Sequence, residues 1–391
     1  MPHPLKLTLP AIITLVTVFG AAAAQAAEKL PSMTEMWETL KQQQQLIESL
    51  KQQQQTTDAK VESTADAVDA RAQHLGSGVV MGGYAEHHFN NPQGGKDIID
   101  AHRFVLLMGH SYSDSVKVFA ELELEHSLAG EGKPGEVELE QAYVQWQYAD
   151  QHRATMGLFL VPVGIINETH EPDTFYGVER NSVEKDIIPA TWWETGGMLS
   201  GAIAPGFSYD LAVHSGLKTT AKDGIRKGRQ KSAEATAETF AYTARLKYTG
   251  LPGLELATSL QYQADLNQDQ TSQGEAGTLW ETHAIYQTGP FALRALYAAW
   301  QIDGASYEAL GTDTQTGLYV EPSYKITDRL GVFSRYSVWN TQGANDAAEK
   351  EAVDVGVNFW LVERVVLKAD YQYALTTTLT DSINLGIGWS F

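Results

Sequence analysis

Three carboxylates alternate with apolar residues in the segment VKVFAELELE at residues 116–125, where Glu121, Glu123 and Glu125 stand two apart. Side chains two residues apart in a β-strand point to the same face, so a strand here carries all three on one side. Neighbouring carboxylates can share the acid and base roles of a hydrolase. The same ladder would also attract cations along a wet surface, and catalysis is therefore the weaker interpretation.

Other signatures of enzymes and metal sites are missing from the sequence. It contains no G-x-S-x-G, H-E-x-x-H or P-loop pattern, and without cysteine it has no disulfide and no thiolate metal site. His87 and His88 are adjacent, so in a strand they point to opposite faces and cannot share one metal ion. His170 has no second histidine at helical spacing. We therefore expect no catalytic residue, no bound metal and no cofactor.

The composition excludes further classes of protein. With 28 basic and 48 acidic residues among 391, the net charge is -20, which argues against nucleic acid as a partner. Disordered chains have few aromatic and many charged residues, whereas this chain has 10% aromatic and only 19% charged residues. The composition favours extensive β-structure.

The first residues have the order of an export signal. Lys6 precedes the apolar stretch Leu7–Phe19, and an alanine-rich segment follows that ends in Ala24-Gln25-Ala26. A positive residue, a short apolar core and an A-x-A site are typical of a secretory signal peptide. The apolar stretch is too short to span a bilayer as a helix. We predict a signal peptide at residues 1–26.

Residues 32–75 follow a seven-residue register. One seam contains Met33, Leu40, Ile47 and Val61, and neither proline nor glycine interrupts it. A hydrophobic period of about 3.5 residues predicts a left-handed coiled coil, and so polar a helix needs partners. The glutamine-rich runs leave open the alternative of a solvated, low-complexity linker.

From Gly78 to Phe391 the sequence alternates with period two in segments of about ten residues. In VDVGVNFWL at residues 353–361, apolar side chains occupy every second position. Short turns such as Ser113-Asp114 alternate with long polar connections near residues 90–97, 127–135 and 164–189, and the segments between them number sixteen. Long outer loops and short periplasmic turns are typical of bacterial outer-membrane barrels.

A sheet that spans a membrane must close on itself, because hydrocarbon cannot satisfy free backbone N–H and C=O groups. A soluble β-sandwich is the alternative, but it does not require loops that alternate in length. Aromatic residues near the segment ends suit the two membrane interfaces. They include Tyr112, Trp146, Tyr148, Tyr286, Tyr324, Tyr371 and Trp389. We predict an all-β transmembrane barrel of 16 antiparallel strands at residues 78–391, preceded by the α-helical coiled coil.

Two motifs resemble those of Gram-negative porins. The chain ends in Gly-Ile-Gly-Trp-Ser-Phe with a terminal aromatic residue, and Val161-Pro162-Val163-Gly164 is followed by Phe175 and Glu179-Arg180. The second stretch is similar to the third outer loop of the phosphate-selective (O and P type) porin family, and the coiled coil resembles the arrangement in DcaP-like dicarboxylate porins. The resemblance implies a homotrimer in the outer membrane of a Gram-negative bacterium, with the coiled coil in the periplasm.

The resemblance further implies that the third outer loop folds into each lumen as a constriction. The candidate constriction residues are Glu168, Glu171, Asp173, Glu179 and Arg180. Phosphate porins depend on many lumenal arginines and lysines, whereas this loop is mainly acidic, which argues against phosphate selectivity. The acids also lack the spacing of a calcium-binding loop.

A sixteen-stranded barrel leaves an aqueous channel, and its lumenal charges set selectivity. The alternation within each segment predicts which charged residues line the pore: Glu121, Glu123, Glu125, Asp210, Arg245, Lys247, Arg294, Lys325, Arg335, Lys368 and Asp370. An acidic wall at residues 116–125 would then face a mainly basic wall, and such a field orients dipolar solutes. The alternative is that these charges only solvate the lumen.

A basic connection follows the seventh segment, at residues 217–236. Its positive residues are Lys218, Lys222, Arg226, Lys227, Arg229 and Lys231. They suit an anion-attracting vestibule or contact with lipopolysaccharide phosphates. A solvated, flexible loop is the alternative, and it is the favoured one.

The sequence therefore predicts an outer-membrane porin for passive diffusion of small hydrophilic solutes or ions. The solute stays open, because the resemblance favours dicarboxylate-like anions and the charge count favours cations. Two other functions remain as alternatives. One is a coiled-coil tether between the outer membrane and peptidoglycan, and the other, less favoured, is an outer-membrane hydrolase.

Overall fold

The computed structural model describes residues 78–269 and 274–391. The predicted signal peptide and the predicted coiled coil lie outside the described residues. In the part that is described, no helix is both long and apolar enough to cross a bilayer.

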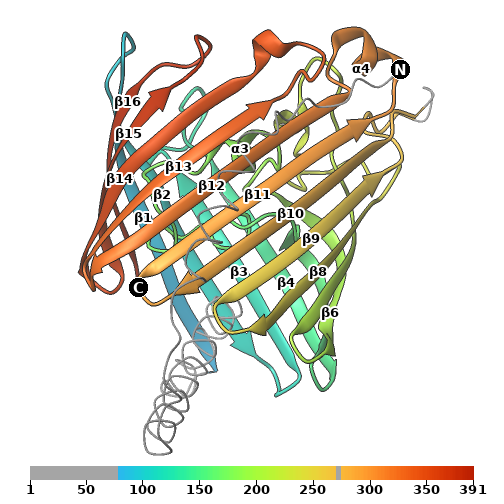
Figure 1. Cartoon of the computed structure of the whole chain (residues 1–391). Coiled ribbons are helices and arrows are strands. Elements are labelled where there is room, and N and C mark those ends of the chain that lie inside the picture. The colour runs from blue at the N-terminus through green and yellow to red at the C-terminus, as the bar shows by residue number, and fades with distance from the viewer. Residues whose placement is uncertain (1–77, 270–273) are drawn as a thin grey trace, which may run out of the picture. The chain divides into compact units, whose positions relative to one another are not determined.

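Sixteen antiparallel strands form one closed barrel in which sequence neighbours pair (Figure 1), as the alternation predicts. The strands are β1 (Val79–Pro92), β2 (Ile98–Ser111), β3 (Val116–Glu125), β4 (Val137–Ala149), β5 (His152–Leu160), β6 (Trp193–Ala204), β7 (Phe207–His214), β8 (Ala241–Leu251), β9 (Leu254–Gln263), β10 (Gly277–Thr288), β11 (Phe291–Ile302), β12 (Thr314–Thr327), β13 (Leu330–Asn340), β14 (Lys350–Val362), β15 (Val365–Ala374) and β16 (Ser382–Ser390).

The barrel closes where β1 pairs with β16. Tyr84 lies opposite Ser390, and the backbones of Gly83 and Phe391 exchange hydrogen bonds of 3.1 and 2.8 Å. Closure gives the backbone N–H and C=O groups of the two edge strands hydrogen-bond partners within the barrel, as a sheet in hydrocarbon requires.

Burial along the strands is the reverse of that in a water-soluble domain. In β14, Val355 and Phe359 point outward and are 46% and 40% exposed, whereas Asp354 and Asn358 point inward and are 4% and 0% exposed. A soluble β-sandwich would bury its apolar face instead. The pattern fits an apolar belt in lipid around a polar interior.

The connections alternate in length, with one difference from the prediction. The first outer connection is short, residues 93–97, because β1 continues to Pro92. The longest connection, residues 161–192, joins β5 to β6 and contains α3 (Ser182–Asp186); we call it loop three. Residues 215–240, which contain η1 (Ile225–Gly228), are called loop four. Two further outer connections contain α4 (Ala305–Leu310) and η2 (Asp346–Ala348).

Part of the lumen is filled by a hydrophobic core. Loop three contributes Ile187 and Trp192, loop four contributes Ile225, and α4 contributes Tyr307. They pack against the inner face of the barrel wall, on Leu279, Leu296, Ala298, Trp300, Ile302, Tyr319, Trp339 and Ala352. These wall residues belong to β10–β14, and Figure 1 shows α3 inside the ring of strands.

Candidate functional site

Loop three crosses the lumen and contacts inward-facing side chains on widely separated strands. Its hydrogen-bond partners include Arg103 in β2, Arg245 in β8, Trp300 in β11, Arg335 in β13 and Lys368 in β15. Only a segment inside the barrel can reach all of these strands. The loop therefore forms the constriction that the resemblance implies.

One side of loop three is held by apolar packing. Ile187 and Trp192 are fully buried against the β10–β14 wall, and Trp300 donates its indole N–H to the carbonyl of Ile187 at 2.8 Å. Fully buried side chains of this size each contribute about 1.5–3 kcal/mol by burial. The indole hydrogen bond adds direction to an otherwise non-directional contact.

Glu184 of α3 organises the same side of the loop. Its carboxylate accepts hydrogen bonds from the backbone N–H groups of Ile165 and Ile166, at 2.8 and 2.6 Å, and from the hydroxyl of Tyr319 at 2.8 Å. The side chain of Asn181 caps α3 by accepting from the N–H of Glu184 at 2.9 Å. Burial raises the pKa of Glu184, although these hydrogen bonds favour its charged form.

Backbone carbonyls of loop three accept hydrogen bonds from the cations of the barrel wall. Arg294 donates to Thr174 at 2.9 Å, and Lys368 donates to Gly177 at 2.8 Å. The Lys368 ammonium also lies 3.6 Å from the centre of the Phe175 ring. The position of the loop thus determines where these wall charges are held.

The predicted constriction residues occupy different positions along the loop. Asp173 accepts from the Ser390 hydroxyl at 2.6 Å, and the carbonyl of Glu171 accepts from Thr174 N–H at 3.0 Å. Arg180 donates to the hydroxyl of Thr191.

Glu179 contacts the first strand of the barrel. It lies 3.0 Å from His88 Nδ1 and accepts from the Asn90 amide at 3.1 Å. Desolvation opposes its ionisation, but the hydrogen bond and charge of His88 outweigh it and lower the pKa of Glu179 to about 2.

Most of the predicted wall charges point inward and are paired with neighbours. Arg245 is held by Asp210, at 2.8 Å, and by Glu168 of loop three. Lys247 lies 3.8 Å from Glu255 on the next strand. Buried charges require such partners, since an uncompensated one is costly.

The same compensation occurs on β12–β14. Arg335 pairs with Glu321 and with Asp354, both at 3.1 Å, and Lys325 lies 5.0 Å from the centre of the Trp360 ring. The basic wall therefore presents less free charge than its sequence suggests, because carboxylates on the neighbouring strands compensate Arg335.

The carboxylate ladder lies beneath loop three. Glu121 and Glu123 are each 2% exposed, whereas Glu125 is only half-buried. Glu121 accepts hydrogen bonds from the Tyr84 hydroxyl at 2.8 Å and from the Gln141 amide at 2.6 Å. The three carboxylates share the lumenal face as the alternation predicts.

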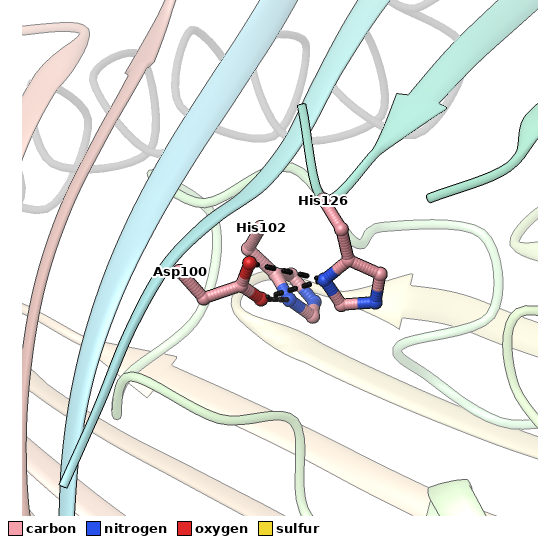
Figure 2. Close-up of side chains that lie close together, drawn as sticks. All are labelled: Asp100, His102 and His126. Carbon is pink, nitrogen blue, oxygen red and sulfur yellow. Dashed lines mark hydrogen bonds and ion pairs between the residues drawn. The ribbon is translucent and has the colours of Figure 1, made fainter. Parts of the chain in front are cut away.

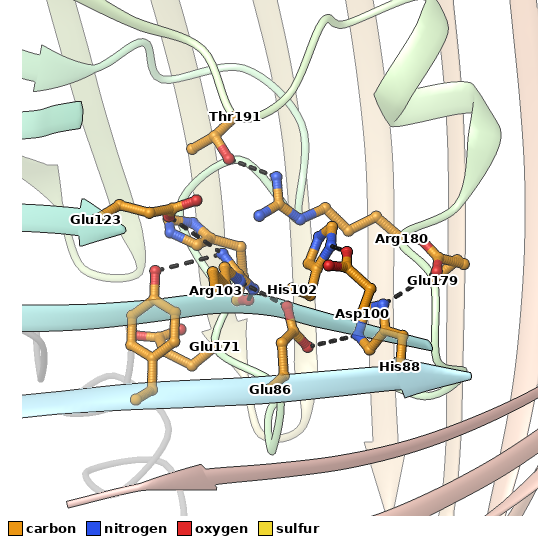
Figure 3. A network of polar contacts seen from close by, with 12 residues as sticks. Glu86, His88, Asp100, His102, Arg103, Glu123, Glu171, Glu179, Arg180 and Thr191 are labelled. Carbon is orange, nitrogen blue, oxygen red and sulfur yellow. Dashed lines mark hydrogen bonds and ion pairs between the residues drawn. The ribbon is translucent and has the colours of Figure 1, made fainter. Parts of the chain in front are cut away.

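A polar network on β1 and β2 escapes the sequence analysis. Arg103 donates from Nε to Glu86 at 2.5 Å and from Nη2 to the carbonyl of His170 at 2.5 Å. Its Nη1 lies 3.9 Å from Glu123, and Figure 3 shows Arg103 among these carboxylates. His88 Nε2 lies 3.3 Å from Glu86 and extends the network towards Glu179.

A β-bulge beside this network changes the alternation in β2. Arg103 pairs with Glu86, and Asp100 pairs with His88. Between these two pairs the chain covers three residues in β2 but only two in β1. Residues three apart then face the same side. A second register shift, after Glu121 in β3, brings both Glu140 and Gln141 of β4 to the buried side. Its only sequence signal is the adjacent polar pair Glu140-Gln141.

The bulge in β2 also assembles a cluster of histidines around one carboxylate. Asp100 lies 3.1 Å from Nδ1 of His102 and 2.8 Å from Nδ1 of His126 (Figure 2). The ring of His102 stacks on His88 with centroids 4.4 Å apart. A second cluster that could hold a metal ion consists of Glu121, Glu140 and His170.

Loop four covers loop three and is not a freely solvated segment. Arg226 donates to the carbonyls of Lys185 and Ala190, at 2.8 and 2.7 Å, and Arg229 donates to the carbonyl of Thr191. Two of the basic residues that suggested an anion vestibule therefore anchor the constriction.

A polar cavity of about 190 Å³ remains beside loop three, bounded by β13–β16. Its charged lining consists of Glu179, Arg180, Lys185, Arg335, Asp354 and Asp370. Basic and acidic groups are equal in number there.

The family of the chain follows from its sequence. Residues 63–379 match the family described as Gram-negative porin. The chain belongs to this family. The family and the closed barrel place this porin in the outer membrane. A relative from Aquifex aeolicus (strain VF5), described as an uncharacterized protein, is 28% identical over 337 residues, which are 77% of each chain.

Solved structures share the fold of this porin at low sequence identity. OmpF of Salmonella typhi in complex with daunomycin has a TM-score of 0.60 at 13% identity, covering 80% of this chain and 97% of that one. DcaP of Acinetobacter baumannii has a TM-score of 0.58 at 13% identity, with the same coverage. The anion-selective porin from Comamonas acidovorans has a TM-score of 0.58 at 12% identity, covering 80% and 99%.

Proposed function

We propose that this porin passes small hydrophilic solutes passively through the part of the lumen that loop three leaves open. The observation that carries the proposal is the polar cavity of about 190 Å³ between loop three and β13–β16. A constriction with charged walls selects solutes by size and charge. The fixed loop sets the size limit, and the groups around the cavity set the charge preference.

The charges around the cavity favour weak ion selectivity. Arg335 pairs with Asp354, and Glu179 contacts His88. Arg180 donates to a neutral hydroxyl, and that contact leaves its charge uncompensated. Arg180 and Lys185 are therefore the groups of loop three through which anions would be attracted.

Removal of both cations tests this function. The double variant Arg180→Gln, Lys185→Gln should shift the cation-to-anion permeability ratio upward by roughly fivefold per charge, since a unit charge nearby in water is worth about 1 kcal/mol. The measurement is the reversal potential in a planar bilayer under a KCl gradient. Arg329→Gln, in the exposed turn between β12 and β13, is the matched control and should change nothing. A native protein that conducts no ions would refute the function, whereas an unchanged ratio would remove only the role of the two cations.

We also propose a homotrimer with its coiled coil in the periplasm, formed after removal of residues 1–26. The seven-residue register of residues 32–75 supports self-association. OmpT of Vibrio cholerae, with a TM-score of 0.54 at 10% identity, is described in a trimer form. The molar mass in detergent and a three-step closure of the current would check the assembly. Deletion of residues 32–75 tests whether the coiled coil contributes to it.

Neither alternative function gains support from the described residues. A hydrolase would need the carboxylate ladder to be accessible, but Glu121 and Glu123 are buried beneath loop three. We infer that the protein is not an enzyme. A cell-wall tether would lose peptidoglycan association when residues 32–75 are deleted, whereas a porin keeps solute flux. Contact with lipopolysaccharide remains a role for the exposed Lys222 and Lys227 of loop four.

A further inference from the structure

Three side chains from β3, β4 and loop three converge beneath the constriction. Nε2 of His170 lies 3.6 Å from Oε1 of Glu121 and 3.5 Å from Oε2 of Glu140. All three residues are buried, with exposures of 2–3%. The separations exceed the 2.7–3.2 Å of a hydrogen bond. They are close to the spacing between ligands that surround one small cation at about 2.0–2.2 Å.

The hydrogen bond of the other ring nitrogen of His170 determines which nitrogen carries the proton. Nδ1 lies 3.2 Å from the carbonyl oxygen of Asn167, which can only accept a hydrogen bond. Nδ1 must therefore carry the proton. In the neutral ring, Nε2 is then an acceptor that faces two carboxylates. Metal-binding histidines are oriented in this way, with the remote N–H donated to a backbone carbonyl.

The atoms that face one another at this point have no hydrogen-bond partner. Among the described residues, Nε2 of His170, Oε2 of Glu140 and Oε2 of the adjacent Glu123 are all buried and make no hydrogen bond. Buried polar atoms are nearly always satisfied, so a group of three orphans requires an explanation.

The charges around these atoms call for a cation. Glu121, Glu123 and Glu140 are buried together, and the nearby Arg103 is engaged at 2.5 Å by a fourth carboxylate, Glu86. Positive charge is therefore stabilised at this point. A proton on Nε2 would supply it, but the N–H would be too far from either carboxylate to form a good hydrogen bond.

We propose that this cluster binds a divalent first-row transition-metal ion through Nε2 of His170 and the carboxylates of Glu121 and Glu140. One imidazole with two carboxylates suits Zn²⁺, Mn²⁺ or Fe²⁺, whereas Ca²⁺ takes oxygen ligands only. Tyr84 and Gln141, which donate to Glu121 at 2.8 and 2.6 Å, would orient that ligand. The bound ion would tie loop three to β3 and β4 and so fix the constriction.

The cluster of Asp100, His102 and His126 provides a comparison within the same lumen. Both histidines place Nδ1 within hydrogen-bond distance of the Asp100 carboxylate, at 3.1 and 2.8 Å, so the two rings satisfy it without an ion. These residues are also partly exposed. The cluster around Asp100, the outer cluster, therefore has its hydrogen bonds satisfied without an ion. The cluster around His170, the buried cluster, does not.

The test uses the full chain without a histidine tag, purified in detergent, stripped with a chelator and reloaded with Zn²⁺ in a metal buffer. The native protein should retain about one Zn²⁺ per chain. Glu140→Gln, which keeps the size of the side chain, should weaken binding by roughly a hundredfold or more, since even residues that only support a ligand contribute 10–100-fold. Asp100→Asn is the matched control and should bind as the native protein does.

The opposite results overturn the proposal. Native-like binding by Glu140→Gln, or loss of the ion only in Asp100→Asn, would exclude the buried cluster as the site. Equal weak binding by all three proteins would indicate an adventitious ion only. Should Glu140→Gln not fold, X-ray absorption of the Zn²⁺-loaded native protein decides. One nitrogen among oxygen ligands supports the buried cluster, and two imidazoles place the ion at the outer one. Conduction does not depend on this outcome, so its failure leaves the proposed porin function intact.

Discussion

Two sides of the lumen hold loop three by different forces. Against β10–β14 the contact is built around an apolar core, in which Ile187 and Trp192 pack on Trp300 and its neighbours, although hydrogen bonds such as that from Tyr319 to Glu184 add to it. Against β1–β4 it is polar and charged, with Arg103 donating to the carbonyl of His170. Apolar burial is non-directional and independent of protonation. Polar contacts in a low dielectric are directional and costly when incomplete.

The two sides therefore have different roles: one retains loop three inside the barrel, and the other sets the position of its charged groups. The apolar side can keep the loop inside the barrel under many conditions, because its packing depends on shape and buried area rather than on charge. The polar side determines the exact position of charged groups, because each contact needs its partner in the right charge state. We therefore expect substitutions on the apolar side to displace the loop more than changes on the polar side do.

The largest effect is expected from Trp300→Ala. Replacing a buried tryptophan by alanine costs about 3–5 kcal/mol, and the hydrogen bond to Ile187 is lost as well. The chain has no cysteine, so a single Val178→Cys, at a position 1% exposed, reports displacement of the loop through labelling by a charged thiol reagent. Labelling should accelerate by roughly a hundredfold or more, since about 1.4 kcal/mol is tenfold. Trp280→Ala, facing lipid and 51% exposed, should leave the rate unchanged.

A smaller effect is expected from Gly388→Val in β16, the strand that pairs with β1 beside the polar side. A Cβ at Gly388 would lie 2.3 Å from Cβ of Pro172 in loop three, so the loop must shift. Overpacking of this kind costs about 1–3 kcal/mol. Single-channel conductance should change, together with moderately faster labelling at Val178→Cys. Ile387→Val, which faces outward on the same strand, is the control. An unchanged conductance would mean that the loop does not rest on β16.

The smallest effect is expected from acid, acting on Glu179. Its pKa is about 2, below the ordinary 4.5, so the ionised form stabilises the contact with His88 above about pH 4.5. That contribution is lost as the pH falls from about 4.5 to 2. The part of the conductance that depends on Glu179 should thus be constant between pH 8 and 5 and change only below that range. Subtracting the profile of Glu179→Gln separates the contribution of this carboxylate from that of every other titratable group. A change centred near neutral pH would contradict this origin.

Much of the barrel can be predicted from the sequence because successive side chains of every strand face lipid and the aqueous lumen in turn. Val355 and Asp354 are adjacent, yet one faces lipid and the other the lumen, and a period of two follows directly. The same rule places Glu121, Arg245 and Lys368 on the inner face. The closed fold then follows from the requirement for backbone hydrogen bonds in hydrocarbon.

The candidate site is less predictable, because it depends on interruptions of that rule and on contacts between distant segments. The bulge opposite Glu86 and His88 turns Asp100 and Arg103 to the same side, and no periodicity shows it. His170 meets Glu121 and Glu140 only because loop three folds inward. Sequence spacing alone excluded a metal site at His170, since its partners lie on other strands rather than in one helix.

The pairing of β1 with β16 has a consequence for biogenesis. The first and last strands of the barrel, β1 and β16, must pair before the barrel is closed. Until then, each of them has one edge with unpaired backbone N–H and C=O groups. Such edges are templates for joining foreign chains. Assembly of this protein must therefore shield both strand edges until they pair. A nascent chain that lacks β16 would keep the edge of β1 unpaired and would be prone to aggregate.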